Sequence, residues 1–392
     1  MKEILQQAQT LQQELVELRR HFHQHPELSG KEFETSDFVA GYLSQLGVEQ
    51  VRRVGKTGVT GLIHGGLPGD VIALRADMDA LPIEEQNSCC YCSKKQGAMH
   101  ACGHDAHITC LLGAAKLLMA NRDQLPGTVK LIFQPAEEIS TGAMELIHAG
   151  ILDNPKVDRI LGLHVLPDVD AGKAYVFSGP FTSSMESFQI TVKGKGGHGS
   201  SPQTAIDPIV TAAQLICALQ TVVSRRAAPQ SAALLTVGTV HSGTQFNIIP
   251  DEAVLTGCIR SLDPVTEQVL HQELIRVSQG VGMATGAECV VETRKIAELL
   301  NNSPAMAADF VRVVRETAGE DTVYLATKGV MFSEDFSYYA NRIPGFMFGL
   351  GVRNPEKGAD YPLHNNHFNL DEDVLSLGAG LFASYCLHRG DL

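Results

Sequence analysis

The strongest constraint on the fold of this chain is an alternation of short apolar runs with longer amphipathic stretches. Residues 71–76, 129–133 and 160–165 are largely apolar and of strand length, and residues 108–120 and 143–149 have helical spacing. Strands that alternate with helices usually form a largely parallel sheet buried between helices. The sequence therefore predicts an α/β domain, with its functional residues just beyond the carboxyl ends of the strands.

The pattern changes between residues 182 and 295. Strands and helices are expected there in the order strand, helix, strand, strand, helix, strand, at residues 188–192, 205–223, 232–240, 252–260, 264–281 and 288–292. This βαββαβ order is typical of a ferredoxin-like α+β domain. Because the first pattern then resumes, we predict one discontinuous domain, residues 1–181 and 296–392, interrupted by a second domain at residues 182–295.

Charge and composition narrow the class of protein. The formal net charge of −13 argues against a nucleic-acid partner, because phosphate binding relies on clustered Lys and Arg. No apolar run reaches the roughly 18 residues of a membrane span, and residues 1–20 lack the apolar core of a signal peptide. Nine unevenly spaced cysteines suit reduced thiols. We therefore expect a cytoplasmic protein without a membrane or nucleic-acid partner.

Possible metal ligands and acid–base groups follow several of the predicted strands. They are Cys102 and His104, Glu137 and Glu138, His164, and either His364 or His367. Sulfur, nitrogen and carboxylate donors from several strand ends are what a transition-metal hydrolase needs. Taken singly, these residues have simpler interpretations: a buried cysteine beside a helix-capping histidine, a solvated acidic loop, and a histidine of the core.

The adjacent carboxylates can divide the chemistry between them. If one glutamate binds metal, the other stays free to accept a proton from water and pass it to a leaving nitrogen. Asp79, which follows the strand at residues 71–76, is a candidate to orient a ligand imidazole; the alternative is a carboxylate that caps a turn.

A second cysteine cluster precedes these residues. Cys89 and Cys92, with Cys102 and His104, have the spacing of a structural zinc knuckle. The ligands of a zinc knuckle usually come as two closely spaced pairs, and His104 is already a candidate ligand of the metal site described above. We therefore favour ordinary surface or pocket-rim thiols at Cys89, Cys90 and Cys92.

Seven motifs in one order make the chain resemble the M20 metallopeptidase family, in its amidohydrolase branch. They are Arg-Ala-Asp-Met-Asp-Ala-Leu-Pro (75–82), His-Ala-Cys-Gly-His-Asp (100–105), Gln-Pro-Ala-Glu-Glu (134–138), Gly-Leu-His-Val (162–165), Gly-Gly-His-Gly-Ser-Ser-Pro (196–202), Phe-Asn-Ile-Ile-Pro (246–250) and Ser-Glu-Asp-Phe (333–336). The resemblance covers nearly the whole chain. It implies a two-metal catalytic domain interrupted by a lid and dimerisation domain.

The resemblance also implies a role for individual residues. The implied metal ligands are Cys102, His104, Glu138, His164 and His364. Glu137 matches the general base. His198 matches a residue that polarises the scissile carbonyl and that, in the family, crosses from the partner subunit. Asn247 and Arg260 are candidates to hold a substrate carboxylate, since a guanidinium pairs with it bidentately; a surface salt bridge is the competing interpretation of Arg260.

These observations predict an enzyme that hydrolyses the amide bond of N-acyl amino acids and works as a homodimer through its inserted domain. Two divalent transition-metal ions are expected, and the mixed ligands admit zinc, manganese, cobalt or nickel. The alternative enzyme is a dipeptidase or carboxypeptidase on the same scaffold. A catalytically inactive metal-binding protein is disfavoured, because Glu137 and every ligand position are present.

Overall fold

The computed structural model describes residues 2–390, which form two compact units. Of these residues, the first unit comprises 2–179, 301–328 and 335–390, and the second comprises Pro180–Leu300 and Gly329–Glu334. The expected insertion, residues 182–295, lies inside the second unit. No pattern in the sequence indicated that the chain returns to the second unit at residues 329–334. Backbone hydrogen bonds, such as Ser183 N–H to the Phe332 carbonyl (2.9 Å), attach it there.

The first unit is built on an eight-stranded sheet with the order β1-β2-β4-β3-β5-β16-β6-β15. Its strands are β1 (Glu49–Val54), β2 (Gly58–His64), β3 (Leu67–Asp77), β4 (Pro126–Gln134), β5 (Arg159–Asp170), β6 (Ala174–Val176), β15 (Val323–Leu325) and β16 (Gly345–Arg353). The central strands β4, β3, β5 and β16 run parallel, whereas β1 and β2 form an antiparallel edge. The predicted α/β class with a mostly parallel sheet is confirmed.

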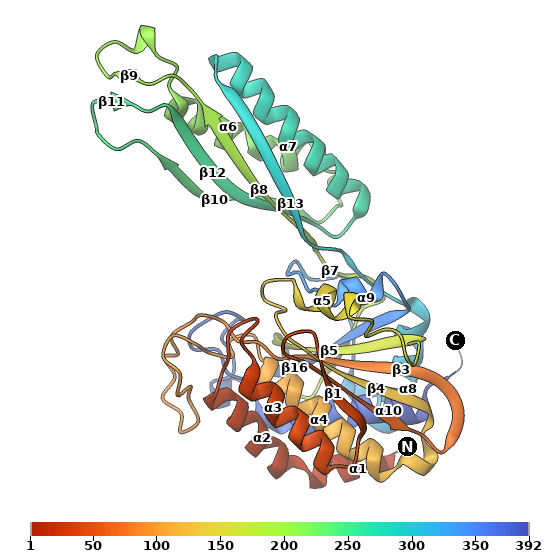
Figure 1. Ribbon diagram of the computed structural model, residues 1–392. Coiled ribbons are helices and arrows are strands. Elements are labelled where there is room, and N and C mark those ends of the chain that lie inside the picture. Colours follow the sequence, from red (N-terminus) through yellow and green to blue (C-terminus); the bar gives the residue numbers. More distant parts are fainter. Residues whose placement is uncertain (1, 391–392) are drawn as a thin grey trace. The chain divides into compact units, whose positions relative to one another are not determined.

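Helices cover both faces of this sheet (Figure 1). They are α1 (Lys2–Thr10), α2 (Gln12–Gln24), α3 (Phe33–Gln45), α4 (His104–Ala120), α5 (Gly142–His148), α8 (Pro304–Thr317), α9 (Ser337–Ala340) and α10 (Leu375–His388). In Figure 1, α2, α3 and α4 lie on one side of the sheet, and α5 and α9 on the other. Helix α4 is buried along most of its length. Its first residue, His104, is therefore held on a rigid element.

The second unit is a four-stranded antiparallel sheet with two helices packed on it. The strands are β8 (Ser184–Lys193), β10 (Ala233–Ser242), β12 (Glu252–Ser261) and β13 (Glu288–Ala297), and the helices are α6 (Pro208–Thr221) and α7 (Pro264–Thr285). The order along the chain is βαββαβ and the order across the sheet is β10-β12-β8-β13. This is the predicted ferredoxin-like arrangement.

Three further features complete the second unit and its ends. A short ribbon pairs β9 (Gly197–His198) with β11 (Ile248–Ile249). Strands β7 (Gly179–Thr182) and β14 (Leu300–Asn302) lie where the chain passes between the two units.

Both helices of the second unit begin at an Asp-Pro pair. The Asp207 carboxylate accepts hydrogen bonds from the N–H groups of Ile209 and Val210, and Asp263 accepts one from Thr266 N–H. These bonds satisfy backbone donors at the helix start, and proline is suited to the first helical position. We predicted that this helix begins at residue 205. The Asp-Pro pair explains why α6 begins at Pro208 instead.

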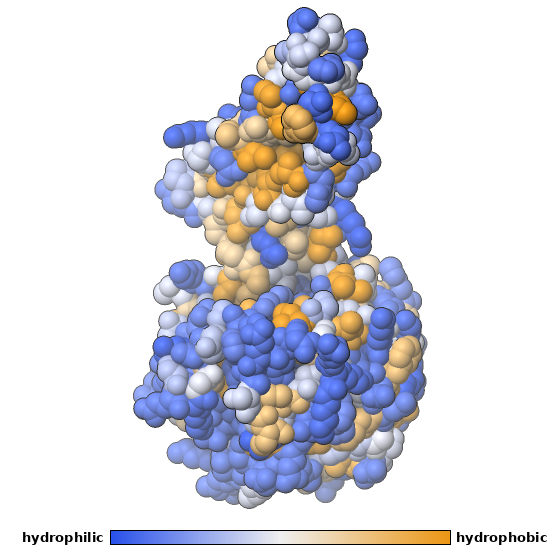
Figure 2. Space-filling view, turned by 90° about the vertical axis from the view of Figure 1, so that its left-hand side faces the viewer, coloured by the Kyte–Doolittle hydropathy of each residue, from blue (hydrophilic) through white to orange (hydrophobic). Residues whose placement is uncertain are grey.

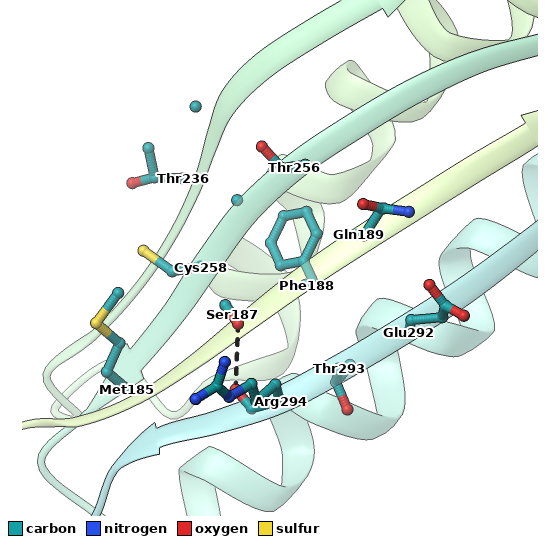
Figure 3. Close-up of a pocket in the computed structure, with 12 residues that line it drawn as sticks. Met185, Ser187, Phe188, Gln189, Thr236, Thr256, Cys258, Glu292, Thr293 and Arg294 are labelled. Carbon is teal, nitrogen blue, oxygen red and sulfur yellow. Dashed lines mark hydrogen bonds between the residues drawn. The ribbon is translucent and has the colours of Figure 1, made fainter. Parts of the chain in front are cut away.

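Helices α6 and α7 cover only one face of their sheet. On the other face, side chains such as Gln189, Thr256 and Cys258 line a shallow hollow (Figure 3). The Ser187 hydroxyl donates a hydrogen bond to the Arg294 carbonyl across this face (3.3 Å). Figure 2 shows apolar side chains gathered on the surface of the second unit, whereas the visible face of the first unit is mostly hydrophilic.

Candidate metal centre

The turn that starts α4 positions Cys102 and His104. Between them Gly103 has φ +81°, and a Cβ atom at this position would come within 2.5 Å of Cγ2 of Val165. Conformation and space therefore both require glycine. The turn lies at the carboxyl end of the sheet, where Sγ of Cys102 is 3.7 Å from Nε2 of His164 on β5.

His164 is held as a neutral imidazole in one tautomer. Its Nδ1–H donates a hydrogen bond to the Val165 carbonyl (2.8 Å), so Nε2, the atom that faces Cys102, is the unprotonated nitrogen. Burial lowers the pKa of His164 to about 4. A neutral imidazole with an unprotonated Nε2 is the form that binds a metal ion.

His104 is oriented in the same manner. Its Nδ1–H donates to the Asp79 carbonyl oxygen (2.8 Å), and its buried Nε2 has no hydrogen-bond partner among the described residues. Nε2 lies 3.7 Å from Oδ2 of Asp77 and 3.9 Å from Oε1 of Glu138, a carboxylate oxygen that is likewise buried without a hydrogen-bond partner. Converging buried donor atoms without hydrogen bonds fit a metal ion between them.

The electrostatics at His104 also fit a cation. Burial lowers the pKa of its imidazole, but the carboxylates of Asp77, Asp79 and Glu138 outweigh burial and raise the pKa to about 10. These carboxylates therefore favour positive charge at the imidazole. A divalent cation at Nε2 supplies that charge without protonating the ligand.

Asp79 fixes the backbone of both adjacent glutamates. Its Oδ1 accepts the Glu137 N–H (3.1 Å) and its Oδ2 accepts the Glu138 N–H (3.0 Å) and the Ser29 hydroxyl (2.6 Å). Burial raises the pKa of Asp79, but its hydrogen bonds, first of all with His104, lower it further than burial raises it. Asp79 thus ties His104 to the backbone of both glutamates, whereas we predicted only that it orients a ligand imidazole.

Glu138 faces the loop that carries His364. Oε1 of Glu138 lies 3.5 Å from Nε2 of His364, and the His364 N–H donates to the Ala101 carbonyl (2.8 Å). His364 has φ +61°, an uncommon backbone conformation for a residue other than glycine. Glu137 is buried, and one of its oxygens lies 3.4 Å from the Asp335 N–H.

The donors form two sets that share Cys102. In one set the donor atoms of Cys102, His104 and His164 lie within 4.8 Å of one another, and in the other those of Cys102, Glu138 and His364 do. A shared thiolate can bridge two cations, since coordination itself deprotonates it. All five predicted ligands are therefore brought together in the first unit, and Glu137 lies beside His104 and Glu138 in a further group of this kind.

Sequence reasoning gave no role to Asp77 and His107. Oδ1 of Asp77 accepts a hydrogen bond from Nδ1 of His107 (2.6 Å), and Nε2 of His107 accepts the Val165 N–H (2.9 Å). The side chain of Asp77 also pairs with Arg75 (2.7 Å). This chain of contacts supports His104 and His164 from behind. Two features of the sequence could have pointed to these residues: Asp77 ends a predicted strand, and His107 lies one helical turn after His104.

His198, Asn247 and Arg260 lie in the second unit. Nδ1 of His198, on β9, accepts the Ser200 N–H (3.1 Å), so its proton is on Nε2, which can donate to an oxyanion. Asn247 directly precedes β11, the partner of β9, and its carbonyl accepts the Gly199 N–H.

Arg260 on β12 is already engaged. Its Nη1 donates to the Met331 carbonyl (3.2 Å) and to the Ser333 hydroxyl (2.9 Å). The partners of Nη1 are thus a carbonyl and a hydroxyl, and not the carboxylate of the surface salt bridge that we considered for Arg260.

The chain resembles known hydrolases over nearly its full length. It is 40% identical over 369 residues to "Thermostable carboxypeptidase 2" of Saccharolobus solfataricus, covering 93% of this chain and 92% of the relative. It is 39% identical to "N-acetyl-L-cysteine deacetylase" of Bacillus subtilis (97% and 88% covered) and 36% identical to "Hippurate hydrolase" of Campylobacter jejuni (96% and 97% covered).

Comparison with solved structures points to the same group of proteins. A crystal structure from Bacillus subtilis, described as a dinuclear metal-binding peptidase of the M20 family, superposes with a TM-score of 0.83 at 34% identity, covering 96% of this chain and 98% of the other. The model of peptidase family M20/M25/M40 matches residues 73–388, which include every ligand position described above. On its sequence, its fold and its converging donors, this chain belongs to peptidase family M20/M25/M40.

Proposed function

We propose that this protein hydrolyses the amide bond of N-acyl amino acids with two divalent metal ions, releasing a carboxylic acid and a free amino acid. The observation that carries the proposal is the pair of donor sets that share Cys102, with Glu137 beside them. Relatives named for deacetylation of N-acetylcysteine and for hippurate hydrolysis support an N-acyl amino acid as the substrate.

Cys102, His104 and His164 would hold one cation, and Cys102, Glu138 and His364 the other. When bound, two such cations supply Lewis acidity, which lowers the pKa of water and stabilises negative charge on the carbonyl oxygen. Thiolate, imidazole and carboxylate ligands together suit zinc, manganese, cobalt or nickel. We propose one of these four as the native metal.

Glu137 is the proposed general base. Its backbone is fixed by Asp79, and its carboxylate is buried beside the ligand residues, so its position does not depend on solvent. It takes a proton from the attacking water and returns it to the leaving nitrogen. His198, through its Nε2–H, is the proposed donor to the carbonyl oxygen, and Asn247 and Arg260 are the proposed partners of the substrate carboxylate.

The substrate class can be tested directly. We expect metal-reconstituted protein to cleave N-acetyl, N-benzoyl or indoleacetyl amino acids faster than free dipeptides, because Glu138, the one carboxylate among the proposed ligands, would be engaged by a metal ion and could not pair with a free α-ammonium group. The measurement is kcat/KM across the two substrate sets, with methyl esters of the best substrates to test the need for a free carboxylate. Faster turnover of dipeptides would replace the amidohydrolase assignment with the dipeptidase or carboxypeptidase alternative.

We further propose a homodimer formed through the second unit. Strand β10 is an edge strand, and Val240 on it is 47% exposed. Ile209 and Val210 on α6 are 46% and 52% exposed. Apolar side chains beside an unpaired strand edge are typical of a subunit interface.

Light scattering at micromolar concentration tests the dimer. Wild-type protein is expected to have the mass of two chains, and Val240→Glu to shift the equilibrium toward monomer, because a charge would be buried at the interface. Val265→Glu is the matched control, since Val265 lies on α7 and is 69% exposed. A monomeric wild type would contradict the dimer, and with it a His198 supplied by the partner.

We propose that the protein is cytoplasmic and acts without a membrane or nucleic-acid partner, as its charge and thiols suggest. One helical stretch, Pro208–Arg226, is long and apolar enough to cross a membrane by length and composition. Leu215 and Leu219 within it are fully buried in the core of the second unit, and core helices of soluble proteins pass the same test. We therefore attribute its remaining apolar side chains to the proposed dimer interface.

A further inference from the structure

Cys89, Cys90 and Cys92, in the loop between β3 and α4, lie outside the two donor sets of the proposed metal centre. Sγ of Cys89 lies 2.6 Å from Sγ of Cys92, and the Cys89 N–H donates a hydrogen bond to the Cys92 sulfur (3.1 Å). Both side chains are partly exposed, and neighbouring Cys90 is exposed. The Cys-x-x-Cys turn therefore holds two thiols face to face where a small reagent can reach them.

The surroundings of this pair favour thiol chemistry over a third metal site. An oxygen of Glu85 lies near both sulfurs, so the three residues could in principle hold an ion. The Glu85 carboxylate is already engaged by the His23 imidazole (3.2 Å) and the Ser93 N–H (2.6 Å). Two thiolates bound tetrahedrally to zinc, at roughly 2.3 Å each, would stand about 3.8 Å apart. The two sulfurs are much closer together than that.

Residues 86–92, which we call the cysteine loop, are hydrogen-bonded to the segment that carries His364. We call residues 364–369 the His364 loop. The Gln86 N–H donates to the Asn366 carbonyl (2.9 Å), and the Asn87 side-chain amide donates to the Phe368 carbonyl (3.1 Å). The Cys92 thiol in turn donates to the Asn87 carbonyl (3.3 Å). A change at Cys92 is thus one hydrogen bond away from the residue that holds the His364 loop.

We propose that Cys89 and Cys92 form a reversible thiol–disulfide site, oxidised by low-molecular-weight disulfides, that controls how firmly the His364 loop is held. The Cys89 thiolate attacks the reagent disulfide and expels one thiolate, which leaves a mixed disulfide on Cys89. Cys92 then attacks the Cys89 sulfur, forms the internal disulfide and expels the second thiolate, which takes the Cys92 proton. Two electrons pass from the cysteine pair to the reagent, and a small thiol reverses both steps.

The environment assigns the order of attack. Burial, the neighbouring thiol of Cys89 and the Glu85 carboxylate raise the pKa of Cys92 to about 12, so Cys92 stays protonated at neutral pH. Cys92 is therefore assigned the second, resolving step. Oxidation removes the Cys92 S–H and with it the hydrogen bond to the Asn87 carbonyl.

Mass spectrometry tests the site itself. Reduced holoenzyme is incubated with oxidised glutathione, and the remaining thiols are blocked with N-ethylmaleimide before digestion. We expect the peptide that contains Cys89 and Cys92 to lose two hydrogen atoms and to be blocked only at Cys90. Cys92→Ser should trap glutathione on Cys89, and Cys90→Ser, the matched control, should still form the internal disulfide. Blocking of both Cys89 and Cys92 after oxidation, or glutathione on Cys90 alone, would overturn the proposal.

Two further measurements separate the alternatives. Hydrogen exchange of the His364 loop should speed up on oxidation in wild type and stay unchanged in Cys89→Ser; unchanged exchange in wild type would overturn the link to the loop. Zinc content should be the same in wild type and in Cys89→Ser. A zinc ion lost in that variant would mean a third metal site instead. Neither readout depends on activity, so each can fail while the proposed hydrolase function stands.

Discussion

Glu137→Gln is expected to lower kcat by at least ~10²-fold and to leave the metal content near that of wild type. Glutamine has the size of glutamate but cannot accept a proton. The Glu137 N–H bond to Asp79 does not involve the side chain, so the substitution leaves the backbone in place. The measurements are kcat on the best N-acyl amino acid and metal analysis of the same sample.

Glu138→Gln is the matched control for this experiment. Oε1 of Glu138 faces Nε2 of both His104 and His364, so its loss should lower metal content and activity together. If Glu137→Gln lost metal while Glu138→Gln kept it, the roles that we propose for the two glutamates would be exchanged.

Asp79→Ala should weaken metal binding by about 10–100-fold, the usual effect of losing a residue that orients metal ligands. The variant leaves the N–H groups of Glu137 and Glu138 without their acceptor, which costs about 1–3 kcal/mol for the buried Glu137 N–H and less for the partly buried Glu138 N–H. It also removes a carboxylate 3.4 Å from Nδ1 of His104. Competition with a chelator of known affinity measures the change.

Ser29→Ala is the control for Asp79. It removes only the hydroxyl that donates to Oδ2 of Asp79 and leaves both glutamate contacts intact. Its metal affinity should stay within a few-fold of wild type, as expected for the loss of about 1 kcal/mol. Wild-type affinity in Asp79→Ala would show that the backbone at residues 137–138 holds its place without this carboxylate.

The order of strands and helices followed from the sequence, but several boundaries did not. Residues 2–24 carry one helical pattern, yet the structure has two helices, α1 and α2, that meet at Leu11. The segment at 329–334 belongs to the second unit, although it is far along the chain from the rest of it. Hydrophobic periodicity reports which face of a local segment is buried, and it carries no information about where that segment turns or which distant strand it joins.

The choice between His364 and His367 shows how far the sequence alone could predict the site residues. Both lie in one loop of similar composition, and only the family resemblance selected His364. In the structure Nε2 of His364 faces Glu138, whereas the His367 ring lies against Tyr361, with centroids 5.2 Å apart. His364 also has a positive φ and a backbone hydrogen bond to the Ala101 carbonyl, and neither feature can be read from the composition of the loop.

The sequence by itself determined the α/β class, the ferredoxin-like insertion and the residue types of the metal centre, because these depend on local periodicity and on side-chain chemistry. Only the tertiary structure decided that Cys102 is shared by two donor sets, that Asp79 holds the backbone of both glutamates, and that Asp77 and His107 pack behind His104 and His164. Each of these relations is a distance of a few ångströms between residues from different strands and loops. Such distances are fixed by how the elements pack, and a linear pattern does not contain them.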